Sequence, residues 1–119
     1  MVEIAVKRVY EPAAKQDGTR VLVDRIWPRG ISKKDLAADD WNKDVAPSTE
    51  LRQWFAHDPE KWGEFRKRHL SELKEHKAEA KKLLSEARSQ RLTLLYAARD
   101  ARHNHALVLK EYLQRLGPS

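Results

Sequence analysis

Side chains capable of acid–base chemistry and anion binding are concentrated in one short segment of the chain. They are Arg99, Asp100, His103, Asn104 and His105. The segment follows a long apolar run and precedes a helical stripe of apolar residues, so we expect it to join a buried strand to a helix. In parallel α/β sheets, ligands bind in the crevice outside the carboxyl ends of the strands. The sequence therefore predicts a ligand site at this loop.

A second cluster follows the second expected strand. It contains Arg25, Trp27 and Arg29. Guanidinium groups at a strand end fork onto phosphate or carboxylate, and an indole supplies a stacking face for a base. In the alternative interpretation, Trp27 belongs to the core. Arg25 then pairs with a nearby acid such as Asp24 or Asp100, and the residues alone leave both interpretations open.

The two clusters meet if their strands run parallel. Their side chains then emerge at one edge of the sheet, facing a helix N-terminus that favours anions. Several cations in one crevice need an anionic partner, either a ligand or a network of buried acids. A ligand is favoured, because buried ion-pair networks seldom stabilise a fold more than apolar packing does. The expected partner is an anionic small molecule or nucleotide, held by Arg25, Trp27, Arg29, Arg99 and Asn104.

The same loop predicts chemistry on a phosphate-bearing substrate, as a transferase or hydrolase, if the chain is an enzyme. His105 is then the proton shuttle, because histidine titrates near neutral pH, and Asp100 is the second catalytic residue. Asp24 and Ser48 are further candidates near the crevice. No metal is expected, since His103 and His105 lie two residues apart at a helix start and diverge by about 200°. No cofactor is expected, because the phosphate-loop and dinucleotide-binding motifs are missing.

Composition limits the remaining classes. The chain has 119 residues, no cysteine and a formal net charge of +6. This length suits one α/β domain over residues 1–119. Without cysteine, thiolate nucleophiles and disulfides are excluded, which fits a reducing compartment. No apolar run reaches ~18 residues and no signal sequence is evident, so we expect no membrane contact and a cytoplasmic location, with the oligomeric state open.

Positive charge is concentrated in the second half of the chain. Residues 61–119 contain 14 Lys and Arg against 7 Asp and Glu. Much of the excess is lysine interleaved with glutamate between residues 72 and 86, which is typical of a solvated helix face. Two alternatives to the ligand site stay open: a non-enzymatic nucleic-acid-binding module that uses this charge, and a structural or adaptor protein.

The expected fold is a small, mostly parallel sheet of about four strands packed with helices. Strands are expected over residues 2–10, 21–23, 41–45 and 92–98. The first two are expected to be antiparallel neighbours, because the connection between them is short for a crossover helix.

Side chains that cap helices mark three helix starts, at Ser32, at Ser48 and at Asp58. The periodic pattern after Asp58 lasts for ~30 residues, which would give a helix ~45 Å long. A compact domain of this size is only ~30–35 Å across, so a break is expected near residues 75–78.

Four sequence blocks in order carry a family resemblance. They are Val23–Gly30, Ala46–Phe55, His57–Pro59 and Leu94–Ala106. From about Ile4 to Leu116 the chain resembles the YeaO-like family of small bacterial proteins of unknown function. The resemblance implies an α/β fold and no established substrate.

The chain also looks like a short branch of a broader group. In that group a Val-Asp-Val-Arg type strand end and a Leu-Leu-Cys-x-Glu…Cys-His-Arg block occupy the matching places. This sequence departs from the second block at Tyr96, Arg99 and residues 104–106. Cysteine-dependent chemistry suggested for such relatives therefore does not transfer to this chain.

Overall fold

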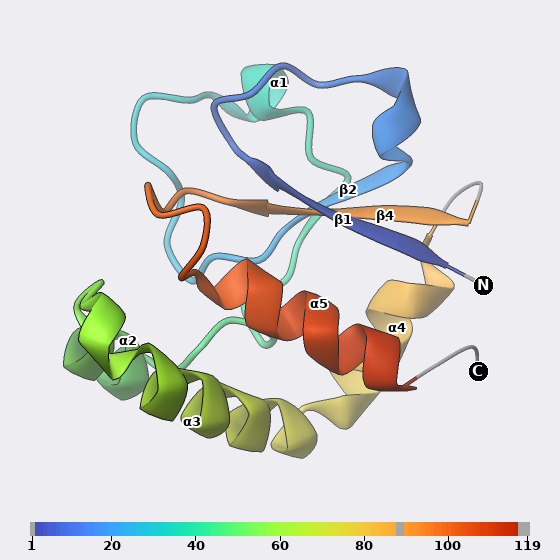
Figure 1. Cartoon of the computed structure of the whole chain (residues 1–119). Coiled ribbons are helices and arrows are strands. Elements are labelled where there is room, and N and C mark those ends of the chain that lie inside the picture. Colours follow the sequence, from blue (N-terminus) through green and yellow to red (C-terminus); the bar gives the residue numbers. More distant parts are fainter. Residues whose placement is uncertain (1, 88–89, 117–119) are drawn as a thin grey trace.

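A parallel sheet forms the middle of the molecule in the computed structural model, which describes residues 2–87 and 90–116 (Figure 1). Its strands are β1 (Glu3–Arg8), β2 (Thr19–Leu22), β3 (Asp40–Trp41) and β4 (Arg91–Tyr96). Their order is β1-β4-β2-β3, and every adjacent pair runs parallel. The α/β class expected from the sequence is confirmed.

Strand β4 lies between β1 and β2, so the expectation that the first two strands are antiparallel neighbours is wrong. Residues 92–96 of β4 are all buried. An apolar strand of this kind is stabilised by a neighbour on each side and a covering layer on each face. The chain after β1 therefore crosses over the sheet, through the short 3-10 helix η1 (Lys15–Asp17), and returns on the far side of β4.

Strand β3 is shorter than the expected strand over residues 41–45. The side-chain oxygen of Asn42 accepts a hydrogen bond of 3.0 Å from the backbone N–H of Asp44. Such a local bond favours a turn over a continued strand. The strand therefore ends at Trp41.

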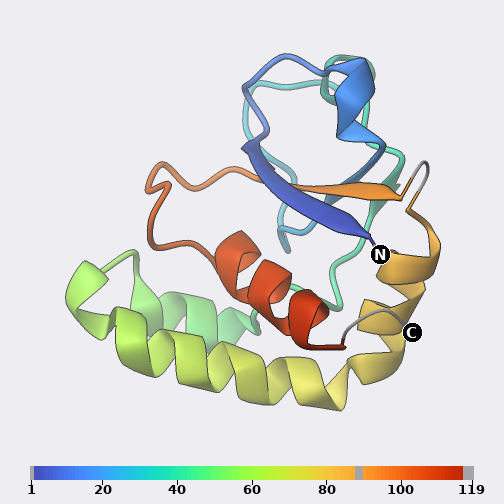
Figure 2. The same ribbon diagram turned by 45° about the vertical axis from the view of Figure 1, so that its right-hand side comes forward.

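Helices cover the two faces of the sheet unequally (Figure 1). One face carries α2 (Thr49–Phe55), α3 (Trp62–Glu75), α4 (Lys77–Ser85) and α5 (His105–Leu116). Of the described helices, the other face carries only η1 and the single-turn helix α1 (Lys33–Leu36). Figure 2 shows α3 and α4 as one arc around α5, which itself lies against the sheet. Among the described residues, no helix has the length and apolarity needed to cross a bilayer.

The three expected helix starts are confirmed by their caps. The Ser32 hydroxyl accepts from the N–H of Asp35, and the Ser48 hydroxyl from that of Leu51, both at 3.1 Å. Asp58 caps a 3-10 turn, η2 (Pro59–Lys61), that leads into α3. These bonds satisfy backbone donors that have no partner inside the helix.

The expected break in the long helical segment is also confirmed. It falls at His76, whose φ of −115° and ψ of 33° depart from helical values. The break turns α4 back toward the start of β4, so that both helices pack on the same core. Ala80, Leu83 and Leu84 of α4 are buried there.

Alternating residues of the strands fill two separate cores. Ile4, Leu92, Leu94 and Tyr96 face the large helical layer. Successive side chains of a strand point to opposite faces, so Leu95 lies in the second core. That smaller core also contains Val9, Leu22 and Leu36, with Trp27 and Trp41 packed against it.

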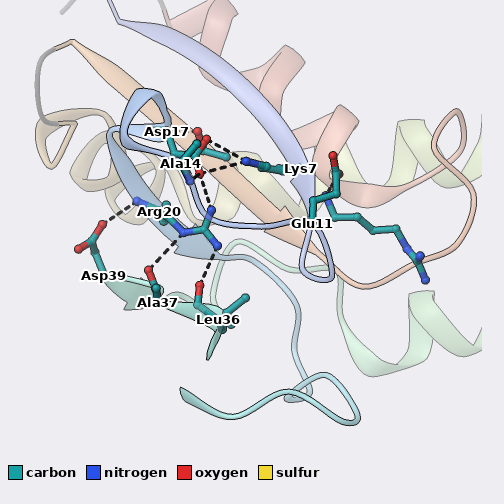
Figure 3. Close-up of polar contacts among 10 residues, drawn as sticks. Lys7, Glu11, Ala14, Asp17, Arg20, Leu36, Ala37 and Asp39 are labelled. Carbon is teal, nitrogen blue, oxygen red and sulfur yellow. Dashed lines mark hydrogen bonds and ion pairs between the residues drawn. The ribbon is translucent and has the colours of Figure 1, made fainter. Parts of the chain in front are cut away.

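A buried ion network ties the smaller face of the sheet together (Figure 3). The Asp17 carboxylate binds the Arg20 guanidinium at 2.5 Å and the Lys7 ammonium at 3.2 Å. Arg20 also donates to the backbone carbonyls of Leu36 and Ala37. Asp17 and Arg20 together therefore connect β1, β2 and α1. Burial acts to raise the pKa of Asp17, but hydrogen bonds from Ala14 N–H, Arg20 and Lys7 outweigh it and hold that pKa below its usual value.

Candidate functional site

The carboxyl ends of β1, β2 and β4 lie at the same edge of the sheet, because all three strands are parallel. We call this the strand-end edge and define it by residues 8–11, 24–30 and 97–105. The premise on which the two sequence clusters were expected to meet, that β2 and β4 run parallel, is therefore confirmed. Which side chains face one another there is decided by the loops.

Asp100 shapes the loop between β4 and α5. Its carboxylate accepts from the backbone N–H groups of Arg102 and His103, at 2.8 and 3.0 Å, and lies 2.8 Å from the His103 ring. The Arg102 N–H, followed by the His103 side chain, holds the pKa of Asp100 below its usual value. The His103 ring in turn packs edge-on against Trp62 of α3. Asp100 is therefore the partner of His103, and not of His105 as expected from the sequence.

Asn104 caps α5 from a buried position. Its side-chain oxygen accepts from the N–H of Leu107 at 3.1 Å, and its amide nitrogen donates to the Asp100 carbonyl at 2.9 Å. The residue is only 2 % exposed. Both ends of the amide are thus bonded to backbone, and the start of α5 has its own cap.

His105 contacts Asp24, which the sequence offered as a further candidate near the crevice but not as the partner of His105. Its Nε2 lies 2.6 Å from Asp24 Oδ1, and the two side chains are largely buried, at 15 % exposed for His105 and 13 % for Asp24. The two atoms are close enough for an ion pair, although their orientation is not that of a regular hydrogen bond. The other carboxylate oxygen of Asp24 accepts from the N–H of Ala97. The pair therefore connects the end of β2 to the end of β4 and to the start of α5.

A second histidine lies behind this pair. His69 of α3 is fully buried, and its ring centre is 6.4 Å from that of His105. Its Nε2 lies 3.2 Å from the Val45 carbonyl and so donates to it, while Nδ1 has no partner among the described residues. Burial, and then the nearby His105, lower the pKa of His69 to about 3. His69 is therefore neutral at physiological pH.

Replacing His105 with asparagine is expected to lower the free energy of unfolding by about 1–3 kcal/mol, because it leaves the buried Asp24 carboxylate without its partner. Denaturant unfolding measures the loss. His57→Asn is the matched control, since His57 is exposed and has a positive φ that asparagine tolerates. A His105→Asn variant as stable as this control would show that the pair has no structural role.

Arginines at the strand-end edge differ from most other described arginines because they have no acidic partner. Elsewhere, the described arginines at positions 20, 66, 68, 91 and 115 each pair with an acid. Six of the described arginines have no acid partner within 4.0 Å, and five of these belong to this edge. The five are Arg8, Arg25, Arg29, Arg99 and Arg102; the sixth is Arg52 on α2.

Two of these arginines are held by backbone carbonyl groups. Arg25 donates to Pro47 at 3.0 Å and to Ala46 at 3.4 Å, so it pairs with neither acid considered from the sequence. Arg8 donates to Ala98 at 3.0 Å and to Ala97 at 3.3 Å. Because a carbonyl is neutral, both guanidinium groups keep their full charge at the edge.

Arg8 and Tyr10 were missed by the sequence reasoning, although β1 ends at the same edge. The Arg8 guanidinium lies 5.0 Å from the centre of the Tyr10 ring, and the Tyr10 hydroxyl donates to the Arg29 carbonyl at 2.8 Å. Tyr10 thus connects the end of β1 to the loop after β2. An arginine at the end of a strand was the available signal, but its use required knowing that β1 is parallel to β4.

The remaining three arginines project into solvent. Arg29, Arg99 and Arg102 are exposed, and none of their side chains has a polar partner among residues 2–87 and 90–116. The acids of the edge are engaged by other groups. Glu11 accepts from the N–H of Arg8, and Asp24 and Asp100 bind as described above. Free guanidinium donors at this edge therefore face outward.

Trp27 lies on the face of the sheet that carries α1, opposite the large helical layer. Its ring nitrogen donates to the Ile31 carbonyl at 2.7 Å, and the ring packs edge-on against Trp41. It is half-buried in the smaller core. This placement agrees with the alternative interpretation from the sequence, in which Trp27 belongs to the core.

Tyr96 ends β4 beneath the loop. Burial, and then the nearby Glu11 carboxylate, raise the pKa of this tyrosine. The phenol is therefore a neutral donor at physiological pH. The chain has no cysteine, so this position offers no thiol.

Comparison with known proteins gives the family. The model of the family described as "Inactive DUF488-N3 subclade" matches residues 3–116. The chain belongs to this family. It is 50 % identical over 115 residues to "Uncharacterized protein YeaO" of Escherichia coli, which covers 97 % of this chain and 100 % of that protein. The YeaO-like resemblance is thus confirmed.

More distant bacterial relatives also match over most of their length. "Uncharacterized protein Mb3100c" of Mycobacterium bovis and "Uncharacterized protein Rv3073c" of Mycobacterium tuberculosis are each 46 % identical over 110 residues. Each alignment covers 92 % of this chain and 92 % of the relative. No solved structure matches the chain.

Proposed function

We propose that the chain binds a phosphate-bearing ligand, a nucleotide or a nucleic-acid fragment, at the strand-end edge. The single observation that supports this is the distribution of arginine partners. Five of the six described arginines without an acid partner gather at the ends of three adjacent strands. Guanidinium groups that have no carboxylate partner favour an external anion, and their planar fork suits phosphate oxygens.

The proposed contacts divide into anchored and free donors. Arg8 and Arg25 are fixed by backbone carbonyls and supply charge from set positions. Arg29, Arg99 and Arg102 are free to close on the ligand, which costs side-chain entropy and limits the affinity of each contact. The start of α5 contributes little, because Asn104 already caps it.

Binding without turnover fits this edge better than transferase or hydrolase chemistry. His105, the expected proton shuttle, has Nε2 2.6 Å from a buried carboxylate oxygen, and the family model that matches the chain is described as inactive. We therefore propose a binding module that acts in the cytoplasm. A chain without cysteine forms no disulfides and so needs no oxidising compartment.

Removing the free arginines is expected to weaken binding. Calorimetric titration with ATP and with pyrophosphate should give a Kd about 5-fold higher for Arg99→Ala and about 10- to 100-fold higher for Arg29→Ala/Arg99→Ala, at about 1 kcal/mol or more per charged contact. Lys81→Ala/Lys82→Ala is the control, since it removes the same charge from the exposed surface of α4. Equal losses in the two double variants would indicate non-specific attraction and contradict the proposal.

A labelled single-stranded oligonucleotide separates the two ligand types. If a nucleic-acid fragment is the ligand, log affinity falls with log salt at a slope of roughly −0.7 for each phosphate contacted. A mononucleotide that binds as tightly as the oligonucleotide identifies the small molecule instead. Failure of every phosphate compound to bind at low salt would leave the edge without this function.

A further inference from the structure

Strand β1 is an open edge of the sheet. It pairs with β4 on one side only, and in both views none of the described elements lies beyond its other side (Figures 1 and 2). The backbone N–H groups of Glu3 and Val9 donate to Gln90 and Tyr96. Polar backbone groups of a strand alternate in direction, so Ile4 and Val6 direct theirs away from β4.

Two devices that often protect such an edge, a proline and a projecting lysine, are absent or engaged elsewhere. Residues 3–8 contain no proline. Lysine is a common guard because its charge projects over the edge. Here Lys7 forms an ion pair with Asp17 on the face of the sheet, and its side chain is only 19 % exposed. Glu11 occupies the N–H of Arg8, which limits the open stretch to the residues before it.

We propose that two copies of the chain join through this edge, with β1 antiparallel to β1 of the partner subunit about a two-fold axis at Ala5. In this register Ile4 lies opposite Val6 of the partner subunit. Both residues direct their backbone groups outward, so the two residues exchange N–H···O bonds as a hydrogen-bonded pair. The symmetric contact closes on itself and limits the assembly to a dimer with one continuous sheet.

Charge complementarity selects this register. Glu3 lies opposite Lys7 of the partner subunit, and the pair occurs twice by symmetry. Glu3 is well exposed, with one carboxylate oxygen 3.1 Å from Arg91. The Lys7 ammonium has three donors and can bind Glu3 of the partner subunit beside Asp17.

A single cysteine at Ala5 tests the pairing, because the chain has no cysteine of its own. In the proposed register the two Ala5 residues form a non-hydrogen-bonded pair with Cα atoms ~4.5 Å apart, within the disulfide range of ~4.4–6.8 Å. Mild oxidation should convert most of the Ala5→Cys protein into a covalent dimer. The controls are Val6→Cys, which faces Ile4 of the partner subunit, and Ser71→Cys on the exposed surface of α3.

Sedimentation of the unmodified chain and of Val6→Pro completes the test. Proline removes only an outward N–H at this position, so the bonds to β4 persist while the dimer should dissociate at least 10-fold more readily. The proposal is overturned if the unmodified chain sediments as a 13.9 kDa monomer at about 0.1 mM, a concentration far above the Kd of a specific dimer. It is also overturned if the control cysteines cross-link as fast as Ala5→Cys, or if an added peptide from another protein is needed to occupy β1.

Discussion

Replacing Asp17 with alanine should lower the free energy of unfolding by about 3 kcal/mol or more. The carboxylate is 10 % exposed and binds the side chains of both Lys7 and Arg20, whereas the neighbouring Asp39 accepts from the Arg20 backbone N–H. Its loss leaves two cations at the smaller core without a counter-charge, and breaking a buried pair from one side is strongly destabilising. Denaturant unfolding at neutral pH measures the effect.

The matched control for this variant is Glu64→Ala. Glu64 pairs with Arg68 at 2.9 Å, but both side chains are about half exposed, and such pairs contribute at most about 1 kcal/mol. If Asp17→Ala costs no more than the control, the network in Figure 3 is not what fastens η1 and α1 to the sheet. Because the folded pKa of Asp17 is depressed, its contribution is present above the ordinary aspartate pKa of 3.8 and lost as the pH falls below it.

His69 should make the fold less stable on mild acidification. Its pKa is about 3 in the folded chain against an ordinary value of 6.5, so the unfolded chain binds the proton first. The contribution is complete above pH 6.5 and is lost as the pH falls toward 3, at about 1.4 kcal/mol per pH unit. Between pH 6.5 and 4.5 the loss is therefore about 2–3 kcal/mol.

The His69→Gln variant isolates this effect. Glutamine can still donate to the Val45 carbonyl but does not titrate. Between pH 6.5 and 4.5 the free energy of unfolding of the variant should therefore fall less steeply with pH, by about 1.4 kcal/mol per pH unit, which corresponds to one proton. Unfolding curves recorded at several pH values for both proteins give the slopes. Identical slopes in the two proteins would mean that His69 is accessible to protons in the folded state.

Local features of the fold were predictable from sequence. Ser32, Ser48 and Asp58 each bond a backbone N–H two or three residues away, so a short window of sequence contains the whole interaction. The break at His76 followed from a length argument, since an unbroken helix would exceed the width of the domain. The order of the strands was not predictable in this way. It depends on β4, far along the chain, entering between β1 and β2.

The candidate site shows the same division. The loops that carry Arg25, Arg29 and Arg99 were predicted to share an edge, because parallel strands place their ends together. The partners within the edge were not predicted. Asp24 rather than Asp100 meets His105, and Arg8 enters from a strand that the sequence placed elsewhere in the sheet. Contacts between residues separated by 80 or more positions are set by packing, which a pattern along one chain does not encode.

Mapping pyrophosphate onto the protein by amide NMR tests the central claim most directly. The arginine distribution predicts saturable shifts in the loops of the strand-end edge, residues 8–11, 24–30 and 97–105, with the largest changes next to Arg29, Arg99 and Arg102. The helices on the far side of the core, α4 above all, should stay unchanged despite their lysines. Shifts concentrated on α4, or no saturable shifts at low salt, would contradict a phosphate-binding edge.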